Sequence, residues 1–458
     1  MTLLDPADPR PVHFVGIAGA GMSALAELFA RRGVAVTGCD AHTDGARDLR
    51  ALGIQLSEGH DPAHVEAARA LVVTSAMPKA HPELERARAL GIPVIRRAEA
   101  LGEATAGHEL VAIAGTHGKS TTSVMTAEAL AAAGRDPTAL VGARVSAWHG
   151  NLRAGNDALY VVEADEYDRS FLALTPTIAV INNVEADHLD IYADLADIRG
   201  AFAQFARGAR VILLGADDAG ANTIPTPSTA EVIRFGVHSA DARLRARDVA
   251  FRDGGSSFAV EFDGEHLGGV QLRVPGMHNV RNALAAVGAG LALGAPLADL
   301  APGLASFAGV ERRFQRIADV RGVAIVDDYA HHPTEIVATL AAARQAFPSR
   351  RLIVAFQPHL YSRTRDFATE FAEALGAADV IFLADLYPAR EQPIPGVSSD
   401  LIANALGAAA HKLAWRGPRE MLAPALAAAV GERDLVITMG AGDITRTGPE
   451  LARLLGAR

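Results

Sequence analysis

The chain has 458 residues, and at roughly 100 to 200 residues per domain this length predicts about three domains. Its 43 basic and 53 acidic side chains give a net charge of −10, which argues against a nucleic-acid scaffold. Half of the residues are apolar, so wholesale disorder is excluded. The single cysteine, Cys39, excludes a disulfide framework and any zinc site built from several cysteines.

Neither an export signal nor a membrane span is expected. Segment 1–15 carries acids and prolines where a secretory signal needs a basic start and an apolar core. The longest uncharged stretch, between Asn282 and Asp299, is rich in Ala and Gly and too short for a typical span. We therefore expect a soluble cytoplasmic protein, with no membrane insertion and no nucleic-acid partner, that is a monomer or a weak homodimer.

The first part of the chain has the pattern of one βαβ unit. A strand at Val12–Val15 is followed by a Gly-rich turn, a helix from Met22 to Arg32 and a second strand at Val34–Gly38. Strands at 71–74 and 93–95 continue the alternation. A first domain is therefore expected over residues 1–107.

Two further α/β domains are expected, over residues 108–317 and 318–458. Strands of the second are predicted at 110–114, 158–162, 177–181 and 211–214, with a β-rich insertion between Glu231 and Val274 and a closing helix from Asn279. Strands of the third are predicted at 322–326, 352–355, 380–383 and 435–438. The fold class is thus α/β, with a Rossmann-like first domain, a central domain of the phosphate-loop ATPase type with a mostly parallel sheet, and a Rossmann-like third domain.

The strongest motif lies where the first strand of the second domain gives way to a helix, and it reads Gly115, Thr116, His117, Gly118, Lys119, Ser120, Thr121. Glycines let backbone N–H groups converge on a phosphate, Lys119 can reach the terminal phosphates, and the Ser120 hydroxyl can bind Mg²⁺. The first glycine of the pattern G-x-x-x-x-G-K-S/T is replaced by Ile113. An ordinary glycine turn would not explain why one of only three lysines falls at this position.

The turn after the first strand imitates a dinucleotide fingerprint. Gly16, Gly19 and Gly21 precede Asp40 at the end of the next strand, but the spacing is G-x-x-G-x-G and Ala18 occupies the second glycine position. A helix N-terminus at this point would suit NAD or the diphosphate of a UDP-sugar, and a purely structural turn is a third reading. We favour nucleotide binding without choosing nicotinamide.

Two acidic clusters, 163–168 and 182–188, follow strands of the second domain at the edge where ligands bind in open α/β sheets. Magnesium prefers oxygen ligands, and Glu163 is placed to supply one, with His188 a candidate ligand of a second ion. Each cluster alone could be a solvated acidic loop. Their shared position favours a metal site.

Polar clusters also mark the third domain and the segments before it. Asn279 could be a helix N-cap, and Arg313 could be a surface cation or could neutralise phosphoryl charge. Segments 327–333 and 357–365 place three histidines and two arginines just past two strand ends, which favours an anion-binding site. A hydrolytic triad is not indicated, because the chain has no G-x-S-x-G elbow.

Assembled in order, these segments resemble the Mur ligase family across essentially the whole chain. The residues that carry the resemblance are G-I-A-G-A-G-M at 16–22, A-G-T-H-G-K-S-T at 114–121, E-A-D-E at 163–166, E-A-D-H at 185–188, H-N-V-R-N at 278–282, R-R-F at 312–314, D-D-Y-A-H-H-P-T-E at 327–335 and F-Q-P-H at 356–359. The resemblance is greatest to the members that join L-alanine to UDP-N-acetylmuramate. It implies a ligase that uses ATP to phosphorylate the lactyl carboxylate and then lets the alanine amine displace phosphate.

The resemblance also implies site roles. ATP would be bound by Gly115, Thr116, His117, Gly118, Lys119, Ser120 and Thr121, with Asn279 at the adenine, Asp328 at the ribose and Arg313 at the γ-phosphate. Ser120, Glu163 and His188 would hold Mg²⁺, as two ions. The UDP end would lie on Gly16, Ile17, Ala18, Gly19, Ala20, Gly21, Met22 and Asp40. His331, His359 and Arg363 would orient the alanine, and Lys119, His188, Arg313 and His331 would form the catalytic set.

Departures from the family pattern leave alternatives open. Ser120 stands where threonine is usual, and Leu360 stands where many members have an arginine thought to contact the amino acid. A recycling ligase that attaches a tripeptide usually has a Glu-Pro-Arg-Ser run where this chain has 357–359 as Gln-Pro-His. Members that use a carbamylated lysine are disfavoured, because no lysine lies between Lys119 and Lys412. An NAD-dependent oxidoreductase would leave the phosphate loop and both acidic clusters unexplained. A non-catalytic nucleotide sensor would bind ATP without amino-acid turnover and stays an alternative.

Overall fold

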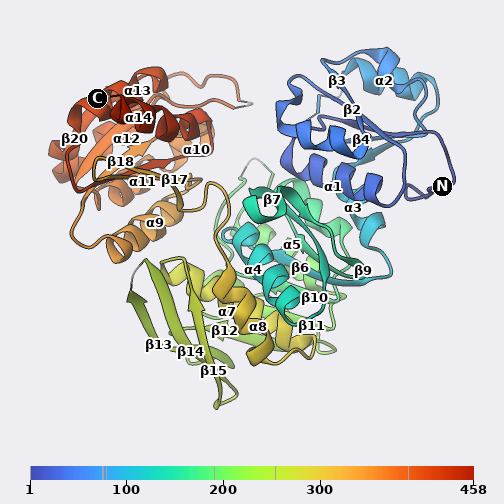
Figure 1. Cartoon of the computed structure of the whole chain (residues 1–458), viewed down its shortest axis with the longest axis horizontal. Helices are drawn as coiled ribbons and strands as arrows, with labels where there is room; N and C mark the ends of the chain where they lie inside the picture. Colours follow the sequence, from blue (N-terminus) through green and yellow to red (C-terminus); the bar gives the residue numbers. More distant parts are fainter. Residues whose placement is uncertain are drawn as a thin grey trace. The chain divides into compact units, whose positions relative to one another are not determined.

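The chain contains three β-sheets, each built from consecutive segments of the sequence (Figure 1). The computed structural model describes residues 2–74, 77–78, 80–189, 191–252, 254–389 and 391–457. They form two compact units, one of residues 1–248, 258–271 and 280–307, the other of residues 249–257, 272–279 and 308–458. Within the described residues, no helix has both the length and the apolar character needed to cross a membrane.

The first sheet is entirely parallel, with strand order β3-β2-β1-β4-β5. One face carries Val12, Phe14 and Val72, which pack with helix α1 in a large core. The other face carries Val15, Cys39 and Leu71, which pack in a smaller core with helix α2. The elements are β1 Val12–Val15, α1 Ala20–Arg31, β2 Val36–Asp40, η1 Thr43–Leu52, β3 Gln55–Glu58, η2 Pro62–Val65, β4 Ala70–Val73, α2 Pro82–Ala89, β5 Val94–Arg96 and α3 Arg97–Thr105.

The second sheet has ten strands in the order β15-β14-β13-β12-β11-β10-β6-β9-β7-β8. Its centre is parallel and fully buried, and β8 is antiparallel to β7. The elements are β6 Glu109–Ala114, α4 Lys119–Ala132, β7 Pro137–Val145, η3 Ser146–Trp148, β8 Gly150–Arg153, β9 Asn156–Glu163, η4 Tyr167–Ala173, β10 Ile178–Ile181, α5 Leu195–Ala206, β11 Val211–Gly215, α6 Ala219–Asn222, β12 Glu231–Gly236, β13 Leu244–Arg252, β14 Gly255–Phe262, β15 Glu265–Leu272, α7 Met277–Ala292 and α8 Leu297–Ser306.

The third sheet has the order β16-β17-β21-β18-β19-β20 and is parallel except for β16. Alternate strand residues pack on α9, α11 and α12 on one face and on α13 and α14 on the other, so the sheet is covered on both sides. The elements are β16 Gln315–Val320, β17 Val323–Asp328, α9 Pro333–Ala346, β18 Arg351–Phe356, α10 Tyr361–Asp366, α11 Ala368–Leu375, β19 Val380–Ala384, α12 Asp400–Ala405, η5 Gly407–Lys412, β20 Leu413–Gly417, η6 Arg419–Met421, α13 Leu422–Ala429, β21 Asp434–Met439, η7 Asp443–Arg446 and α14 Thr447–Gly456.

The predicted α/β fold class, with three sheets in series and a β-rich extension of the second, is confirmed. The predicted strands all occur, with ends that shift by up to about two residues, as is usual for element boundaries. Strands β3, β7, β8, β16 and β20 were not expected from the sequence. The domain boundaries expected after residues 107 and 317 stay predictions.

Candidate active site

The loop between β6 and α4 has the backbone shape of a phosphate cradle. Gly115 and Gly118 have φ angles of 139° and 79°, which side-chain-bearing residues rarely adopt. A Cβ atom on Gly118 would lie 2.6 Å from Oδ1 of Asn282, so the loop also has no room there. Helix α4 begins at Lys119, which leaves its free N–H groups and positive dipole end beside this loop.

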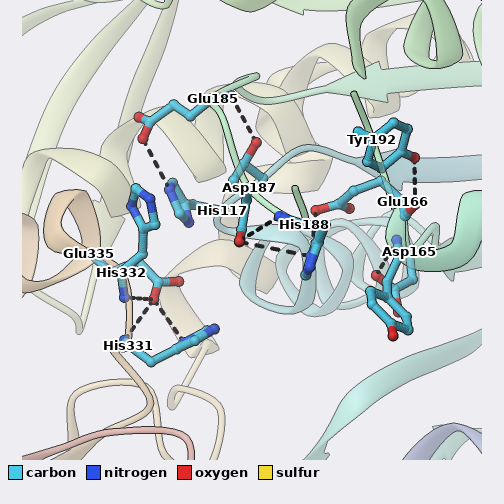
Figure 2. Close-up of polar contacts among 12 residues, drawn as sticks. His117, Asp165, Glu166, Glu185, Asp187, His188, Tyr192, His331, His332 and Glu335 are labelled. Atoms are coloured by element: carbon cyan, nitrogen blue, oxygen red, sulfur yellow. Dashed lines mark hydrogen bonds and ion pairs between the residues drawn. The ribbon is translucent and has the colours of Figure 1, made fainter. Parts of the chain in front are cut away.

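Hydrogen bonds fasten this loop to the segment that follows β10. Asn183 accepts from the Thr116 amide at 3.0 Å through its carbonyl and from the His117 amide at 2.7 Å through Oδ1. The Glu185 amide donates to Oγ1 of Thr116 at 2.9 Å, and the His117 ring lies 3.4 Å from the Glu185 carboxylate. The structure therefore brings the second acidic cluster directly against the phosphate loop, as Figure 2 shows for His117 and Glu185.

Lys119 folds back over its own loop. Its ammonium donates to the Gly115 carbonyl at 2.8 Å and lies 2.8 Å from the Glu166 carboxylate. Burial works to lower the pKa of Lys119, but the attraction of Glu166, Asp165 and Glu163 outweighs it and raises that pKa. The lysine is a fixed positive charge at the position where the sequence predicts phosphate.

Glu166 is a site residue that the sequence analysis did not select. Its side chain is buried, and Tyr192 donates to its backbone carbonyl at 2.6 Å (Figure 2). Burial raises the pKa of Glu166 to about 7, although the charge of Lys119 works in the opposite direction. No local signal in the acidic cluster 163–168 distinguishes Glu166 from its acidic neighbours.

The residues predicted to hold magnesium offer a suitable donor set. Ser120 is 4% exposed and lies in the first turn of α4. Glu163 ends β9, and its carboxylate accepts from the Gly142 amide at 2.6 Å. Nε2 of His188 lies 3.8 Å from carboxylate oxygens of Glu166 and Asp187. Hydroxyl and carboxylate oxygens are suitable ligands for a hard cation such as Mg²⁺. Several carboxylates lie around a single lysine here, and this excess of negative charge favours binding of a cation.

The N-terminal glycine turn is held by β2. The amides of Gly16 and Ile17 donate to the Cys39 carbonyl at 2.8 and 3.0 Å. The Ala18 amide donates to Oδ2 of Asp40 at 3.0 Å, so this carboxylate stabilises the turn itself. A Cβ atom on Gly21, in the first turn of α1, would lie 3.0 Å from the guanidinium of Arg97, a cation that the sequence analysis did not select.

In the second unit, Asp328 and Arg313 lie around the end of β17. Asp328 accepts from the Phe314 amide at 2.7 Å and the Ala330 amide at 2.8 Å. Burial raises the pKa of Asp328 to about 6, while Arg313 and these two amides work to lower it. The Arg313 guanidinium lies 3.6 Å from Glu335 and over the Tyr329 ring.

Asn279 lies in the first turn of α7, and its Nδ2 donates to the Pro275 carbonyl at 2.7 Å. This bond ties the side chain to the turn before the helix, but Asn279 lies inside α7 and donates the bond, so it is not the N-cap that was one reading of the sequence. Its contact with adenine stays a prediction.

The predicted amino-acid residues lie together on the third sheet. The His331 and His359 rings are 6.0 Å apart at their centroids, and His359 stacks on Tyr387. Nδ1 of His331 lies 3.1 Å from the Glu335 carboxylate (Figure 2). The same nitrogen lies 3.0 Å from the Tyr329 carbonyl.

Arg363 is 7% exposed and lies in α10, one turn after His359. Between them Leu360 has φ 71°, a left-handed conformation that is strained for a leucine. Strain of this kind collects at functional sites, so one of the two departures from the family pattern, Leu360, falls on a backbone of unusual conformation.

Three family models match successive parts of the chain. They are described as Mur ligase family, catalytic domain, over residues 11–109; Mur ligase middle domain, over residues 113–290; and Mur ligase, glutamate ligase domain, over residues 312–442. The phosphate loop and both acidic clusters lie in the second match, and His331, His359 and Arg363 lie in the third.

Curated relatives match over nearly the full length. UDP-N-acetylmuramate–L-alanine ligase from Acidothermus cellulolyticus is 45% identical over 94% of this chain and 91% of its own. The protein of the same name from Salinibacter ruber is 43% identical over 97% of this chain and 95% of its own.

Solved structures agree with these relatives. The UDP-N-acetylmuramate-alanine ligase from Thermotoga maritima matches with a TM-score of 0.84 and 28% identity over 98% of this chain and all of its own. A murein peptide ligase from Psychrobacter arcticus matches with a TM-score of 0.73 and 25% identity over 98% of this chain and 99% of its own.

Proposed function

Because this chain belongs to the Mur ligase family, we propose that it joins L-alanine to the lactyl carboxylate of UDP-N-acetylmuramate in an ATP-dependent reaction. The observation that carries this proposal is the identity of 43–45% over almost the whole chain to relatives named for that ligation. The product would serve the synthesis of peptidoglycan precursors.

The chemistry needs ATP because a carboxylate is a poor electrophile at neutral pH. A carboxylate oxygen attacks the γ-phosphorus, ADP leaves, and an acyl phosphate forms. The alanine amine then attacks the acyl carbon, the C–O bond to phosphate breaks, and the amine loses its proton. Charge builds on the transferring phosphoryl group, so positioned cations should contribute most of the rate enhancement.

We assign ATP to the loop from Gly115 to Thr121. Lys119 would exchange Glu166 for the β- and γ-phosphates, an exchange supported by its position at the N-terminus of α4. Asn279 would meet adenine, Asp328 the ribose, and Arg313 the γ-phosphate. The Arg313 side chain is 29% exposed and lies 3.6 Å from Glu335, which is compatible with this role.

Magnesium would be held by Ser120 and Glu163, with His188 serving a second ion. When bound, it would neutralise phosphate charge. The neighbouring carboxylates of Glu166 and Asp187 lie within 3.8 Å of the His188 ring and would keep that ring oriented.

The UDP end would lie on residues 16–22, with the α1 N-terminus toward the diphosphate. His331, His359 and Arg363 would hold the alanine. A proton on Nδ1 of His331 can be donated to Tyr329 or Glu335, which leaves Nε2 able to accept the proton that the alanine amine loses.

The test is phosphate release from ATP with UDP-N-acetylmuramate, measured with and without L-alanine. We expect release that depends on alanine, and the Lys119→Met variant should lose it. Release that depends on a murein tripeptide instead would assign the chain to recycling, and no amino-acid-dependent release would refute ligation. Cytoplasmic location and a monomeric or weakly dimeric state stay predictions.

A further inference from the structure

A second group of metal-type ligands lies in the first sheet, outside all the residues assigned above to substrates. It comprises His13, Cys39, His60, His64, His81 and Glu83, which we call the histidine cluster. The side chains come from β1, β2, the η2 segment and the start of α2, so segments far apart in sequence converge here. The cluster is therefore formed by the fold, and it is not a run of charged residues that are neighbours in the sequence.

The distances within the histidine cluster are those of atoms that could share one ion. Sγ of Cys39 lies 3.4 Å from Nε2 of His13 and 3.1 Å from Oε1 of Glu83. Nδ1 of His64 lies 2.8 Å from the same Glu83 oxygen, and one ligand atom from each of these four residues lies within 4.8 Å of every other. In a tetrahedral zinc site, bonds of about 2.0–2.3 Å put neighbouring ligand atoms about 3.3–3.7 Å apart. Small shifts of these side chains would therefore bring the four ligand atoms to the distances of a tetrahedral zinc site.

Glu83 is a buried carboxylate surrounded by neutral or weakly basic groups. It is 0% exposed, and its ion-pair partners in the described part of the chain are three histidines, His60 at 3.3 Å, His64 at 2.8 Å and His81 at 3.8 Å. A buried carboxylate is costly without a matching positive charge. A divalent cation would supply one.

His81 adds an independent sign that a ligand is expected. It is 8% exposed, and among the described residues its Nδ1 has no hydrogen-bond partner. Buried polar atoms are nearly always paired, so an unsatisfied ring nitrogen at the edge of this cluster needs an explanation. The His60 and His81 ring centroids are 4.6 Å apart, and Nδ1 of each ring lies within 3.8 Å of the Glu83 carboxylate.

We propose that His13, Cys39, His64 and Glu83 bind a divalent transition-metal ion of the zinc class, with His60 and His81 as flanking or exchange ligands. Thiolate and imidazole ligands select zinc over magnesium, which would want a set of oxygens. The ion would fix the end of β2, whose Cys39 carbonyl accepts the Gly16 and Ile17 amides. It would thereby stabilise the turn to which the UDP end is assigned.

The test is a metal titration of the full chain after removal of metals with a chelator, under reducing conditions and with excess Mg²⁺ to occupy the phosphate-loop acids. Cobalt(II) alone is the first probe. We expect one equivalent to give visible bands of tetrahedral cobalt and a near-ultraviolet thiolate-to-cobalt band, both removed by one equivalent of Zn²⁺. No substrate is present, so the result is independent of the proposed ligase activity.

Variants identify the ligands. Cys39→Ser should lose the near-ultraviolet band, and the less buried His64→Gln should weaken Zn²⁺ binding by about tenfold or more. His42→Gln changes an exposed histidine of the same domain outside the histidine cluster and should bind as the parent does. Circular dichroism checks that each variant folds. Absence of the thiolate band in the parent, or Zn²⁺ affinity unchanged in His64→Gln, would overturn the proposal.

Discussion

The cations assigned to ATP are each held by a carboxylate of the chain itself. Lys119 pairs with Glu166 at 2.8 Å, and Arg313 lies 3.6 Å from Glu335. If ATP binds as proposed, its phosphates would compete with a protein carboxylate at both positions. The net charge of −10 does not prevent the binding of anionic substrates, because their binding depends on the exchange of ion-pair partners at individual cations.

Arg363 offers the sharpest test of the amino-acid site. We expect Arg363→Ala to raise the KM for L-alanine by about 10- to 100-fold, as for loss of a charged hydrogen bond, with the KM for ATP unchanged. Arg365→Ala is the matched control, because Arg365 lies on the same helix, is exposed and pairs with Asp366 at 2.7 Å. Steady-state kinetics on folded protein decide the matter, and equal alanine KM values in the two variants would contradict this placement.

Asp328 should make stability depend on pH. Its pKa is raised from 3.8 to about 6 in the folded protein, so between these values the folded state binds more protons than the unfolded state. Stability should therefore fall as pH rises from about 4 to 6, by up to about 3 kcal/mol, and the cost should be complete above pH 6. Asp328→Asn should remove this slope.

The measurement is urea unfolding at several pH values in a Trp148→Phe background, where Trp415, packed on Phe382 of the third sheet, is the remaining tryptophan. The Asn variant has its own constant cost at the two amides, so only the pH slope is compared. Parallel curves for the parent and the variant would show that Asp328 does not titrate in this range.

Site residues that belong to a recognisable sequence motif could be predicted from the sequence. Site residues that are identified only by their burial or contacts in the structure could not. Lys119, Glu163 and His188 follow from loop and strand-end patterns. Glu166 and Arg97 do not, because nothing local tells which acid of a run turns inward or which arginine of a pair reaches Gly21. The histidine cluster was hidden for the same reason, since its members are spread from residue 13 to residue 83.

At the scale of elements, most central strands were predictable, and four of the five strands that were not expected lie at sheet edges; β7, which is internal, is the exception, and the edge strand β5 was predicted. β6, β10 and β17 are buried along almost their whole length and read as continuous apolar runs. β8, β16 and β20 lie at the ends of their sheets and alternate buried or half-buried with more exposed positions. Their sequences, such as GNLR and QRIADV, carry no apolar run for a pattern to detect.

A glycine-to-alanine substitution just before α4, in the phosphate loop, should impair ATP binding, whereas the same substitution just after α4 should be tolerated. Gly118 and Gly134 lie just before and just after α4, with φ 79° and 75°. A Cβ on Gly118 would meet Asn282 at 2.6 Å, whereas nothing lies within 4 Å of one on Gly134. Gly118→Ala should weaken ATP binding by tenfold or more, and Gly134→Ala should cost only backbone strain of about 1 kcal/mol.

Isothermal titration with ATP and Mg²⁺ compares these two variants, and thermal melting reports their stability. Similar ATP affinity in both would show that the shape of the loop around Gly118 is not what binds phosphate. Similar melting temperatures of the two variants, together with a weaker ATP affinity of Gly118→Ala, would give the clearest support for phosphate binding by this loop.

At the scale of the whole molecule, the three sheets fall into two compact units, and each unit carries one of the two tryptophans. Trp148 lies in the first unit, where its Nε1 donates to Glu128 at 2.6 Å, and Trp415 lies in the second. The sheets that carry residues 16–22 and the phosphate loop share the first unit, joined by contacts such as Arg32 with Asp157 at 3.1 Å. They should therefore unfold together.

We expect UDP-N-acetylmuramate to raise the unfolding midpoint reported by Trp148 in a Trp415→Phe variant, and to leave that reported by Trp415 in the Trp148→Phe variant nearly unchanged. A ligand present at a hundredfold excess over its Kd stabilises the unit that binds it by about 2.7 kcal/mol. The nucleotide end is assigned to the first unit, so the gain should appear there. Uridine is the control, because it lacks the diphosphate that the α1 N-terminus would bind. Equal shifts at both tryptophans would mean that the two units unfold as one, and a shift at Trp415 alone would place the nucleotide end on the second unit.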